Sequence, residues 1–498
     1  MRKITAAYYY TVGICAAIII AFIAVINVIF AFEKNLYIYL LVMAFSFLAL
    51  IILFRCGKIK ERHFFYIFIP MAVLCRVALS LAIDACPVSD FSVMYNAARQ
   101  AAMGDFSFQN NPYFFYWSYQ TGFVLYQALI ISVLGDSTTA LLVMNGLTMA
   151  ATNILIYCII KNTTQNSRSA MFGAILYLLY PAQYLYVSVL TNQHLALFFI
   201  LFGLFVITQQ HIGYRNSIIG GALIAMGNII RPIGIVVMIP VMIFFFVRLL
   251  EDTNLQRIRD RWKEYLGKLT RAVSFLVAYV LVGIVASTAV MVTGVNAQGL
   301  KNNDPYWKYV VGLHVETYGR YTRELVSAVS QAKTLEERHQ IERDLIAASL
   351  SKIKADPVPF FYEKSTGMWA NYENTSWAFG QKASVNREEA TNVLWKSIAY
   401  EVVRIDKCYY LFLFLTALAG MIVAILKKKL TPPLCLIALT FCLYFGIHLV
   451  LEIQTRYRDF AMPFICIMAS YGWLLLPADT YNGSMKLDTK IEKLNGMM

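Results

Sequence analysis

The chain has 498 residues, of which 59% are hydrophobic and only 14% are charged. This composition, with a mean hydropathy of +0.58, excludes an ordinary soluble globular protein and indicates a polytopic membrane protein. The net charge of +14 comes from lysines and arginines in short clusters between apolar stretches. Such clusters indicate membrane topology, so we expect membrane lipids and no nucleic acid as partners.

The first three predicted spans are residues 8–32, 36–54 and 64–83, each close to the roughly 20 apolar residues that a spanning helix needs. The basic turn 55–62 between the second and third spans marks the cytoplasmic side. Residues 1–63 therefore form an N-terminal pair of transmembrane helices with a basic cytoplasmic turn, and the N-terminus is predicted to be cytoplasmic.

A long polar segment follows at residues 84–136, which this topology places outside the cytoplasm. Its apolar part, residues 122–134, is too short to cross the roughly 30 Å hydrocarbon core but suits a helix lying at the membrane interface. With this helix at the interface, the basic residues further along the chain fall on the cytoplasmic side. Residues 64–294, including this loop, are predicted to form the transmembrane core.

The remaining apolar stretches predict nine more spans, for about twelve in all. The stretch 216–249 is broken at Arg231-Pro232, and proline biases the residue before it away from helical geometry. We therefore expect two short helices there that turn outside the cytoplasm. The other seven predicted spans are residues 137–160, 169–188, 191–210, 272–293, 407–426, 433–451 and 459–476.

Residues 295–402 are polar and predict an extracytoplasmic cap, with an amphipathic helix over 334–354. Residues 403–476 hold the C-terminal transmembrane helices, and 477–498 form a polar cytoplasmic tail. The predicted fold is thus an all-α polytopic membrane protein. It has about twelve transmembrane helices, an interfacial helix in the first large outer loop, a small and mostly helical cap, and both termini in the cytoplasm.

Acidic residues are absent from the predicted membrane core after residue 137, and they occur at its boundaries, as Asp136, Asp406, Glu452 and Asp459 do. Ion-coupled transporters usually carry the coupling proton on an intramembrane carboxylate. The pattern therefore argues against a proton-driven pump and favours chemistry at the outer interface.

Asp90 and Asp84 are the candidate catalytic carboxylates in the first outer loop. Asp90 precedes an apparent helix that contains Phe91 and Tyr95, so it could instead be a helix N-cap that accepts backbone N–H bonds. As a general base it would take the proton of a hydroxyl group in a partly desolvated pocket. We rank Asp90 ahead of Asp84.

Arginines at the outer turns are candidate ligands of a donor phosphate, because an arginine at a helix end needs water, a carboxylate or a phosphate. They are Arg231, Arg456 and Arg458. The candidate sugar or lipid contacts are mostly aromatic, although tyrosine and tryptophan also populate ordinary interface belts and the histidine could be a plain turn residue. They are Tyr95, Tyr113, Trp117, His194 and Tyr457. No CxxC pair or Asp-x-Asp motif is present, so we expect no metal site and no cofactor.

Several motifs in this order resemble the C-type glycosyltransferase superfamily, in particular the branch of protein O-mannosyltransferases and aminoarabinose transferases. They are Ser89-Asp90-Phe91 with Tyr95, Ala98 and Gly104, the interfacial residues 123–135, Arg231-Pro232, and Arg456-Tyr457 before Pro463. The resemblance implies a polyprenyl-phosphate sugar donor, inversion at the anomeric carbon, and an aspartate base in the first outer loop. The chain departs from the family at Asn192-Gln193-His194, where an acid is frequent, and at Tyr119-Gln120-Thr121, where Pro-Pro is usual.

The sequence therefore predicts a membrane glycosyltransferase, either a hexosyl- or a pentosyltransferase. It would move a sugar from polyprenyl phosphate to a hydroxyl of an envelope glycan, lipid or protein on the extracytoplasmic face. The alternatives are a flippase or transporter of lipid-linked glycans, a glycan polymerase, and a non-catalytic assembly subunit in which Asp90 is only a helix cap.

Overall fold

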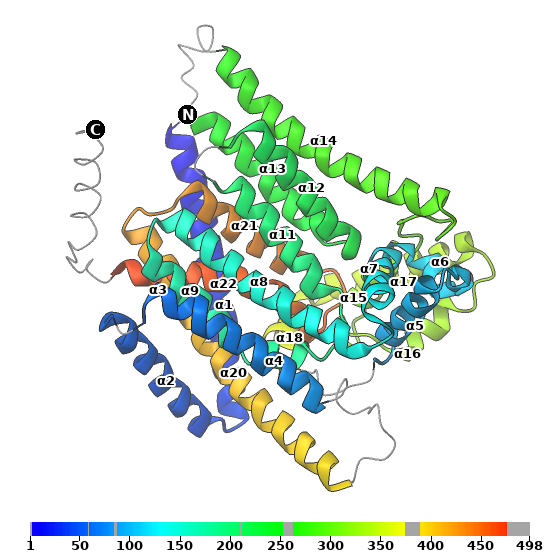
Figure 1. The fold of residues 1–498 in the computed structure, drawn as a ribbon, viewed down its shortest axis with the longest axis horizontal. Helices are drawn as coiled ribbons and strands as arrows, with labels where there is room; N and C mark the ends of the chain where they lie inside the picture. Colours follow the sequence, from blue (N-terminus) through cyan, green and yellow to red (C-terminus); the bar gives the residue numbers. More distant parts are fainter. Residues whose placement is uncertain are drawn as a thin grey trace.

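A computed structural model of the chain describes residues 2–57, 59–83, 87–209, 212–251, 262–373 and 389–475. The described residues form helices and connecting turns without any β-strand, which confirms an all-α fold (Figure 1). Two parts of the sequence interpretation, Asp84 and the tail 477–498, lie outside the described residues.

Seven helices in the described part of the chain are long and apolar enough to cross a membrane, so the protein is polytopic. The predicted total of twelve spans stays a prediction. The seven are α1 (Arg2–Glu33), α2 (Tyr37–Arg55), the continuous run α3–η1–α4 (Glu61–Ile83), α8 (Thr138–Thr164), α13 (Gly234–Glu251), α14 (Trp262–Val292), and α20 (Glu389–Leu426) from Tyr400 onward.

Shorter apolar helices fill the centre of the bundle. Every residue of α22 (Met462–Ser470) is buried, and this helix packs against α20, α21 (Pro432–Ile447), α8 and α9 (Ser167–Leu178). The turn η5 (Thr455–Phe460), which carries the predicted arginines, leads directly into this buried helix. The surrounding helices therefore hold the turn in place.

The apolar stretch 216–249 is divided into two helices at Arg231-Pro232, as predicted. Helix α12 (Tyr214–Ile230) ends immediately before Arg231, and α13 begins at Gly234. Arg231 has an extended backbone, with φ −149° and ψ 127°, as expected for a residue that precedes proline. Helix α12 packs between α11 (Gln193–Ile207) and α14, so its end is fixed relative to the bundle.

The segment predicted to be the first outer loop folds into short helices. They are α5 (Asp90–Ala102), η2 (Ser107–Asn110), α6 (Pro112–Tyr116), η3 (Ser118–Gln120) and α7 (Thr121–Leu134). Helix α7 has 14 residues and packs against α5. At a rise of 1.5 Å per residue it is about 21 Å long, less than the roughly 30 Å hydrocarbon core, in agreement with the short helix expected there.

The cap is helical, with α15 (Trp307–Gly312), α16 (Arg323–Val329), α17 (Leu335–Ala355) and α18 (Pro357–Trp369). Helix α17 matches the predicted amphipathic segment and starts with a capping box between Thr334 and Glu337. The cap helices α15, α16 and α17 lie at the same end of the molecule as α5, α6 and α7 (Figure 1). Direct bonds join it to the loop, since Ser118 Oγ donates to the Lys301 carbonyl at 2.6 Å.

The cap also rests on the turn after α21. The Glu452 N–H donates to the Lys308 carbonyl over 2.9 Å, and the Ile453 N–H donates to the Gly319 carbonyl over 2.9 Å. Gly312 makes this close approach possible, because a Cβ atom there would lie 2.3 Å from the Leu451 carbonyl carbon. The fold thus brings the cap, the first outer loop and the turn 452–458 together at one end of the bundle.

Candidate active site

Two arginines from distant parts of the chain flank the ring of Tyr457. The guanidinium carbon of Arg231 lies 5.2 Å from the Tyr457 ring centroid, and that of Arg456 lies 5.6 Å from it. The Arg456 guanidinium also lies 5.1 Å from the ring centroid of Phe91, in the first turn of α5. Both distances to Tyr457 are typical of cation–π contacts, so two positive charges converge on one aromatic ring.

Hydrogen bonds fix Arg231 to two other turns. Its Nη1 donates to Asn192 Oδ1 over 2.9 Å, and Asn192 Nδ2 donates to Gln120 Oε1 over 3.0 Å. Gln120 ends η3 directly before α7, and Asn192 directly precedes α11. The chain Gln120–Asn192–Arg231 therefore links the first outer loop to the turns before α11 and after α12. Three turns that are distant in sequence act as one rigid support.

Asp90 is the first residue of α5, and its side chain is exposed. The N-cap of this helix is Ser89, and no side-chain bond caps it. Ser89 has φ 50° and ψ −132°, a left-handed conformation that costs a non-glycine residue about 1–3 kcal/mol and is frequent at functional sites. The structure therefore gives Asp90 no capping role and presents its carboxylate at the surface.

The Asp90 carboxylate acts electrostatically on Arg456 and on two tyrosines of the aromatic segment. Burial lowers the pKa of Arg456, but Tyr457, Glu452 and Asp90 outweigh it, so the net shift is upward and Arg456 is a cation. Burial raises the pKa of Tyr113 well above its usual range, and the negative charge of Asp90 raises it further. Asp90, Tyr113, Arg231, Arg456 and Tyr457 are thus the predicted site residues that the fold brings together.

Sequence reasoning missed Lys308 of the cap helix α15. Its ammonium pairs with Glu452, and its charge acts on Tyr119 and Tyr457. Burial lowers the pKa of Lys308, but the Glu452 carboxylate reverses this and raises it above its usual range. No local sequence signal marks this lysine, because only the docking of the cap onto the turn at Glu452 brings it to the site.

Trp117 adjoins this group, and Tyr95 lies about one helical turn after Phe91 in α5. The Tyr95 hydroxyl donates to Asp136 Oδ1 over 3.0 Å, next to the ion pair between Arg99 and Asp136. The Trp117 ring centroid lies 5.2 Å from that of Tyr113, and Trp117 packs on the cap. Trp117 therefore adjoins the aromatic side of the site, whereas the contacts of Tyr95 lie toward the start of α8.

Arg458 and His194 point into the bundle. Arg458 Nη2 lies 2.9 Å from Glu373 Oε2 and its Nη1 donates to the Asn371 carbonyl over 2.8 Å, with both charged side chains almost fully buried. His194 is also buried, with Nε2 3.2 Å from the Tyr186 carbonyl and Nδ1 3.8 Å from Asp459. The described contacts of these two side chains do not include Arg231, Arg456 or Asp90.

A metal could be held by Asp304, His339 and Glu342 in the cap, the one such grouping found among the described residues. It uses none of the residues around Tyr457. The group around Tyr457 combines a surface carboxylate, two arginines and aromatic rings. Such a set can accept a proton, neutralise a phosphate and stack on a sugar ring or an apolar chain.

Residues 122–282 match the model of the family described as dolichyl-phosphate-mannose-protein mannosyltransferase. This match confirms the resemblance to the C-type glycosyltransferases. The matched residues run from α7 into α14, and so include Asn192 and Arg231 of the site around Tyr457. They make up about a third of the chain and leave out Asp90 and Arg456. No curated protein matches the chain.

Two solved structures are distantly similar to the fold. One is the archaeal oligosaccharyltransferase AglB from Archaeoglobus fulgidus in complex with an inhibitory peptide and a dolichol-phosphate, with 10% identity and a TM-score of 0.43 over 84% of this chain and 51% of that one. The other is ArnT from Cupriavidus metallidurans bound to undecaprenyl phosphate, with 11% identity and a TM-score of 0.34 over 82% of this chain and 78% of that one. The chain spans about half the length of the archaeal protein.

Proposed function

We propose that this protein is a membrane glycosyltransferase that moves a sugar from a polyprenyl-phosphate donor to a hydroxyl of an envelope glycan, lipid or protein. One observation carries the proposal: Arg231 and Arg456 flank Tyr457, and the Asp90 carboxylate acts on Arg456. A carboxylate that acts on one arginine, with a second arginine on the same tyrosine ring, suits a reaction in which a hydroxyl loses a proton while a phosphate leaves. The match to a mannosyltransferase family supports the same class of reaction.

In the proposed reaction, the acceptor oxygen attacks the anomeric carbon from the side opposite the phosphate. Asp90 takes the hydroxyl proton, the new C–O bond forms, and the bond between the anomeric carbon and the phosphate oxygen breaks. The sugar is transferred with inversion, and the electron pair of the broken bond leaves on the polyprenyl phosphate. Arg231 and Arg456 stabilise that charge, so the proposed chemistry needs neither an acid catalyst nor a metal ion.

The other predicted residues take supporting roles in this proposal. Tyr113, Trp117 and Tyr457 provide rings for the sugar or the isoprenoid chain, and Lys308 adds a third positive charge near Tyr457. Asp84 stays the second candidate for the base.

Tyr95, His194 and Arg458 are proposed to support the site through their contacts with Asp136, Asp459 and Glu373. The basic turns between the apolar helices support a site on the extracytoplasmic face and cytoplasmic termini.

The proposal can be tested with the full-length protein in lipid nanodiscs and radiolabelled polyprenyl-phosphate sugars. We expect transfer to envelope acceptors, at a rate that does not depend on added Mg²⁺ or Mn²⁺. Asp90→Asn should lower the rate by about 10²–10⁴-fold, because a general base typically contributes that much. Arg231→Gln should lower it by about 10²–10³-fold through lost stabilisation of the phosphate charge.

Matched control variants are Asp344→Asn and Arg323→Gln, since both residues are exposed and lie on the cap helices α17 and α16. They should retain the wild-type rate. Full activity of a folded Asp90→Asn protein would show that Asp90 is not the base. Failure of the wild-type protein to transfer sugar from any polyprenyl-phosphate donor would refute the proposed function.

A further inference from the structure

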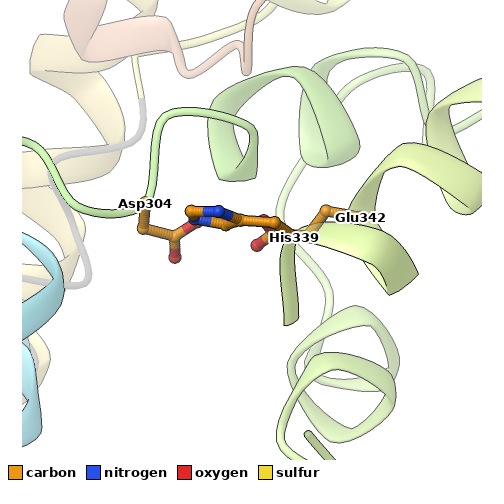
Figure 2. Close-up of side chains that lie close together, drawn as sticks. All are labelled: Asp304, His339 and Glu342. Carbon is orange, nitrogen blue, oxygen red and sulfur yellow. The ribbon is translucent and has the colours of Figure 1, made fainter. Parts of the chain in front are cut away.

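Three potential metal ligands converge in the cap, outside the site around Tyr457. Figure 2 shows the side chains of Asp304, His339 and Glu342 close together, and their ligand atoms all lie within 4.8 Å of one another. His339 and Glu342 are three residues apart on α17 and so share one face of that helix. Asp304 reaches them from the segment before α15. Asp304 and Glu342 are buried, and His339 is half-buried.

Three carboxylate oxygens of Asp304 and Glu342 have no hydrogen-bond partner among the described residues. Asp304 Oδ2 accepts from Arg338 Nη2 at 2.6 Å and from Nε at 3.1 Å, but Oδ1 is buried and has no hydrogen-bond partner among the described residues. Both oxygens of Glu342 are buried and have no hydrogen-bond partner in the described part of the chain, and Arg338 Nε lies 3.4 Å from Oε1. Buried oxygens of this kind require an explanation, such as an ion or a proton.

His339 is oriented as a metal-bound histidine usually is. Its Nε2 lies 2.9 Å from the Asn303 carbonyl oxygen, which can only accept a hydrogen bond, so Nε2 carries the proton. In the neutral imidazole, Nδ1 then holds the lone pair that a metal ion needs. Metal-binding histidines commonly donate their second ring N–H to a backbone carbonyl in this manner, which fixes the ring and its tautomer.

The charges of the buried groups in the cluster also favour a bound cation. The two carboxylates and Arg338 give a net charge of minus one when His339 is neutral, and the second arginine that acts on Glu342, Arg343, is exposed to solvent. The Arg338 guanidinium is held by Asp304 and lies 4.3 Å from the Tyr116 ring centroid and 5.9 Å from that of Trp307. It therefore fixes Asp304 Oδ2 and leaves Oδ1 for another ligand.

We propose that Asp304, His339 and Glu342 bind one divalent transition-metal ion, for which Zn²⁺ is the best match. Zinc accepts imidazole nitrogen and carboxylate oxygen at about 2.0–2.2 Å, commonly with three protein ligands and a water molecule. Calcium and magnesium prefer oxygen ligands alone, so the histidine disfavours them. Tetrahedral ligands around zinc lie about 3.4 Å apart, and small side-chain rotations can bring the present donors to that spacing.

The ion would act on the structure of the cap. It joins α17 to the segment before α15, and Arg338 extends the network to Tyr116 at the end of α6. Metal binding would thereby fix the cap against the aromatic segment 113–119 of the first outer loop. The metal site and the proposed sugar-transfer site use different residues, so either can fail without the other.

The alternative is a proton shared by the two carboxylates. Burial and then the neighbouring Asp304 raise the pKa of Glu342 to about 8, so a protonated Glu342 would also resolve the charge. Glu342→Gln separates the two cases, because glutamine resembles a protonated glutamate in shape but is a poor metal ligand.

The experiment uses the full-length protein, stripped with a chelator and then incubated with Zn²⁺ alone. After desalting, elemental analysis should find about one zinc per chain, and zinc should raise the melting temperature of the wild-type protein. Glu342→Gln and His339→Ala should each weaken zinc binding by about tenfold or more and abolish the thermal shift. His314→Ala is the matched control in the cap, since His314 contacts Thr317 and Glu316 instead, and it should bind zinc as the wild type does.

Two results would overturn the proposal. One is a wild-type protein that holds no zinc after desalting and shows no thermal shift, and this measurement requires no variant to fold. The other is stoichiometric zinc that Glu342→Gln and His339→Ala retain, which would place the ion elsewhere. A Glu342→Gln protein with wild-type stability in the absence of zinc, together with no zinc binding by the wild type, would establish the shared proton.

Discussion

Gly122 lies where the first turn of α7 passes the last turn of α12. A Cβ atom at this position would lie 2.3 Å from the Ile229 carbonyl oxygen and 2.9 Å from Ile229 Cγ2. Ile229 is two residues before Arg231, and Gly122 is two residues after Gln120, which is linked to Arg231 through Asn192. The substitution Gly122→Ala therefore tests whether the packing of α7 on α12 positions Arg231.

The expected magnitude follows from the required displacement. Ordinary contact begins at 3.4 Å, so the helices must separate by about 1 Å, and a misplacement of that size can cost about 10²-fold in rate. Overpacking typically costs about 1–3 kcal/mol, whereas alanine gains up to about 1 kcal/mol over glycine from helix propensity. We therefore expect a net loss of stability of up to about 3 kcal/mol, together with the loss of rate.

The assay is sugar transfer in nanodiscs together with thermal unfolding of the same preparations. Gly283→Ala in α14 is the matched control, because a Cβ atom there has no neighbour within 4 Å. The control should keep its activity and should not lose stability. If Gly122→Ala retained both the rate and the melting temperature of the wild type, the close approach of α7 and α12 would not position Arg231.

Two further predictions concern buried charges. Glu373→Gln should lower the stability by about 3–5 kcal/mol, because it leaves the buried Arg458 without its carboxylate; a wild-type melting temperature would contradict this. Lys364 is buried in α18, and burial lowers its pKa from 10.5 to about 7. Because its folded-state pKa is the lower one, the unfolded state binds more protons between about pH 7 and 10.5, so stability should rise with pH across that window. Melting curves over this range should show the rise in stability in the wild type and no such rise in Lys364→Met. An identical pH dependence in both proteins would exclude the assigned role of Lys364.

Arg456 and Arg458 show how far the sequence can predict the candidate site. Both follow the same apolar segment and are two residues apart, so the pattern makes them equivalent candidates for phosphate binding. They lie in the 3₁₀ turn η5, where three residues complete a turn and residues two apart point in different directions. Arg456 contacts Phe91 and Tyr457, whereas Arg458 pairs with Glu373 inside the bundle.

His194 shows the same limit. The sequence places it at an outer turn between two apolar spans, and the structure places it in the first turn of α11. The rotation of that helix in the bundle turns the imidazole toward Tyr186 and Asp459. No local pattern specifies this rotation, because it depends on packing against a turn more than 250 residues further along the chain.

Local chemistry by itself determined the class of the protein and the boundaries of several helices. The apolar composition required a polytopic helical fold, Pro232 ended α12, and Thr334 with Glu337 started α17. Only the tertiary structure decided which polar groups meet: Arg231 with Tyr457, Lys308 with Glu452, and Asp304 with His339. Such contacts join residues that are distant in sequence. They depend on how whole helices pack against one another, and no short stretch of sequence encodes that packing.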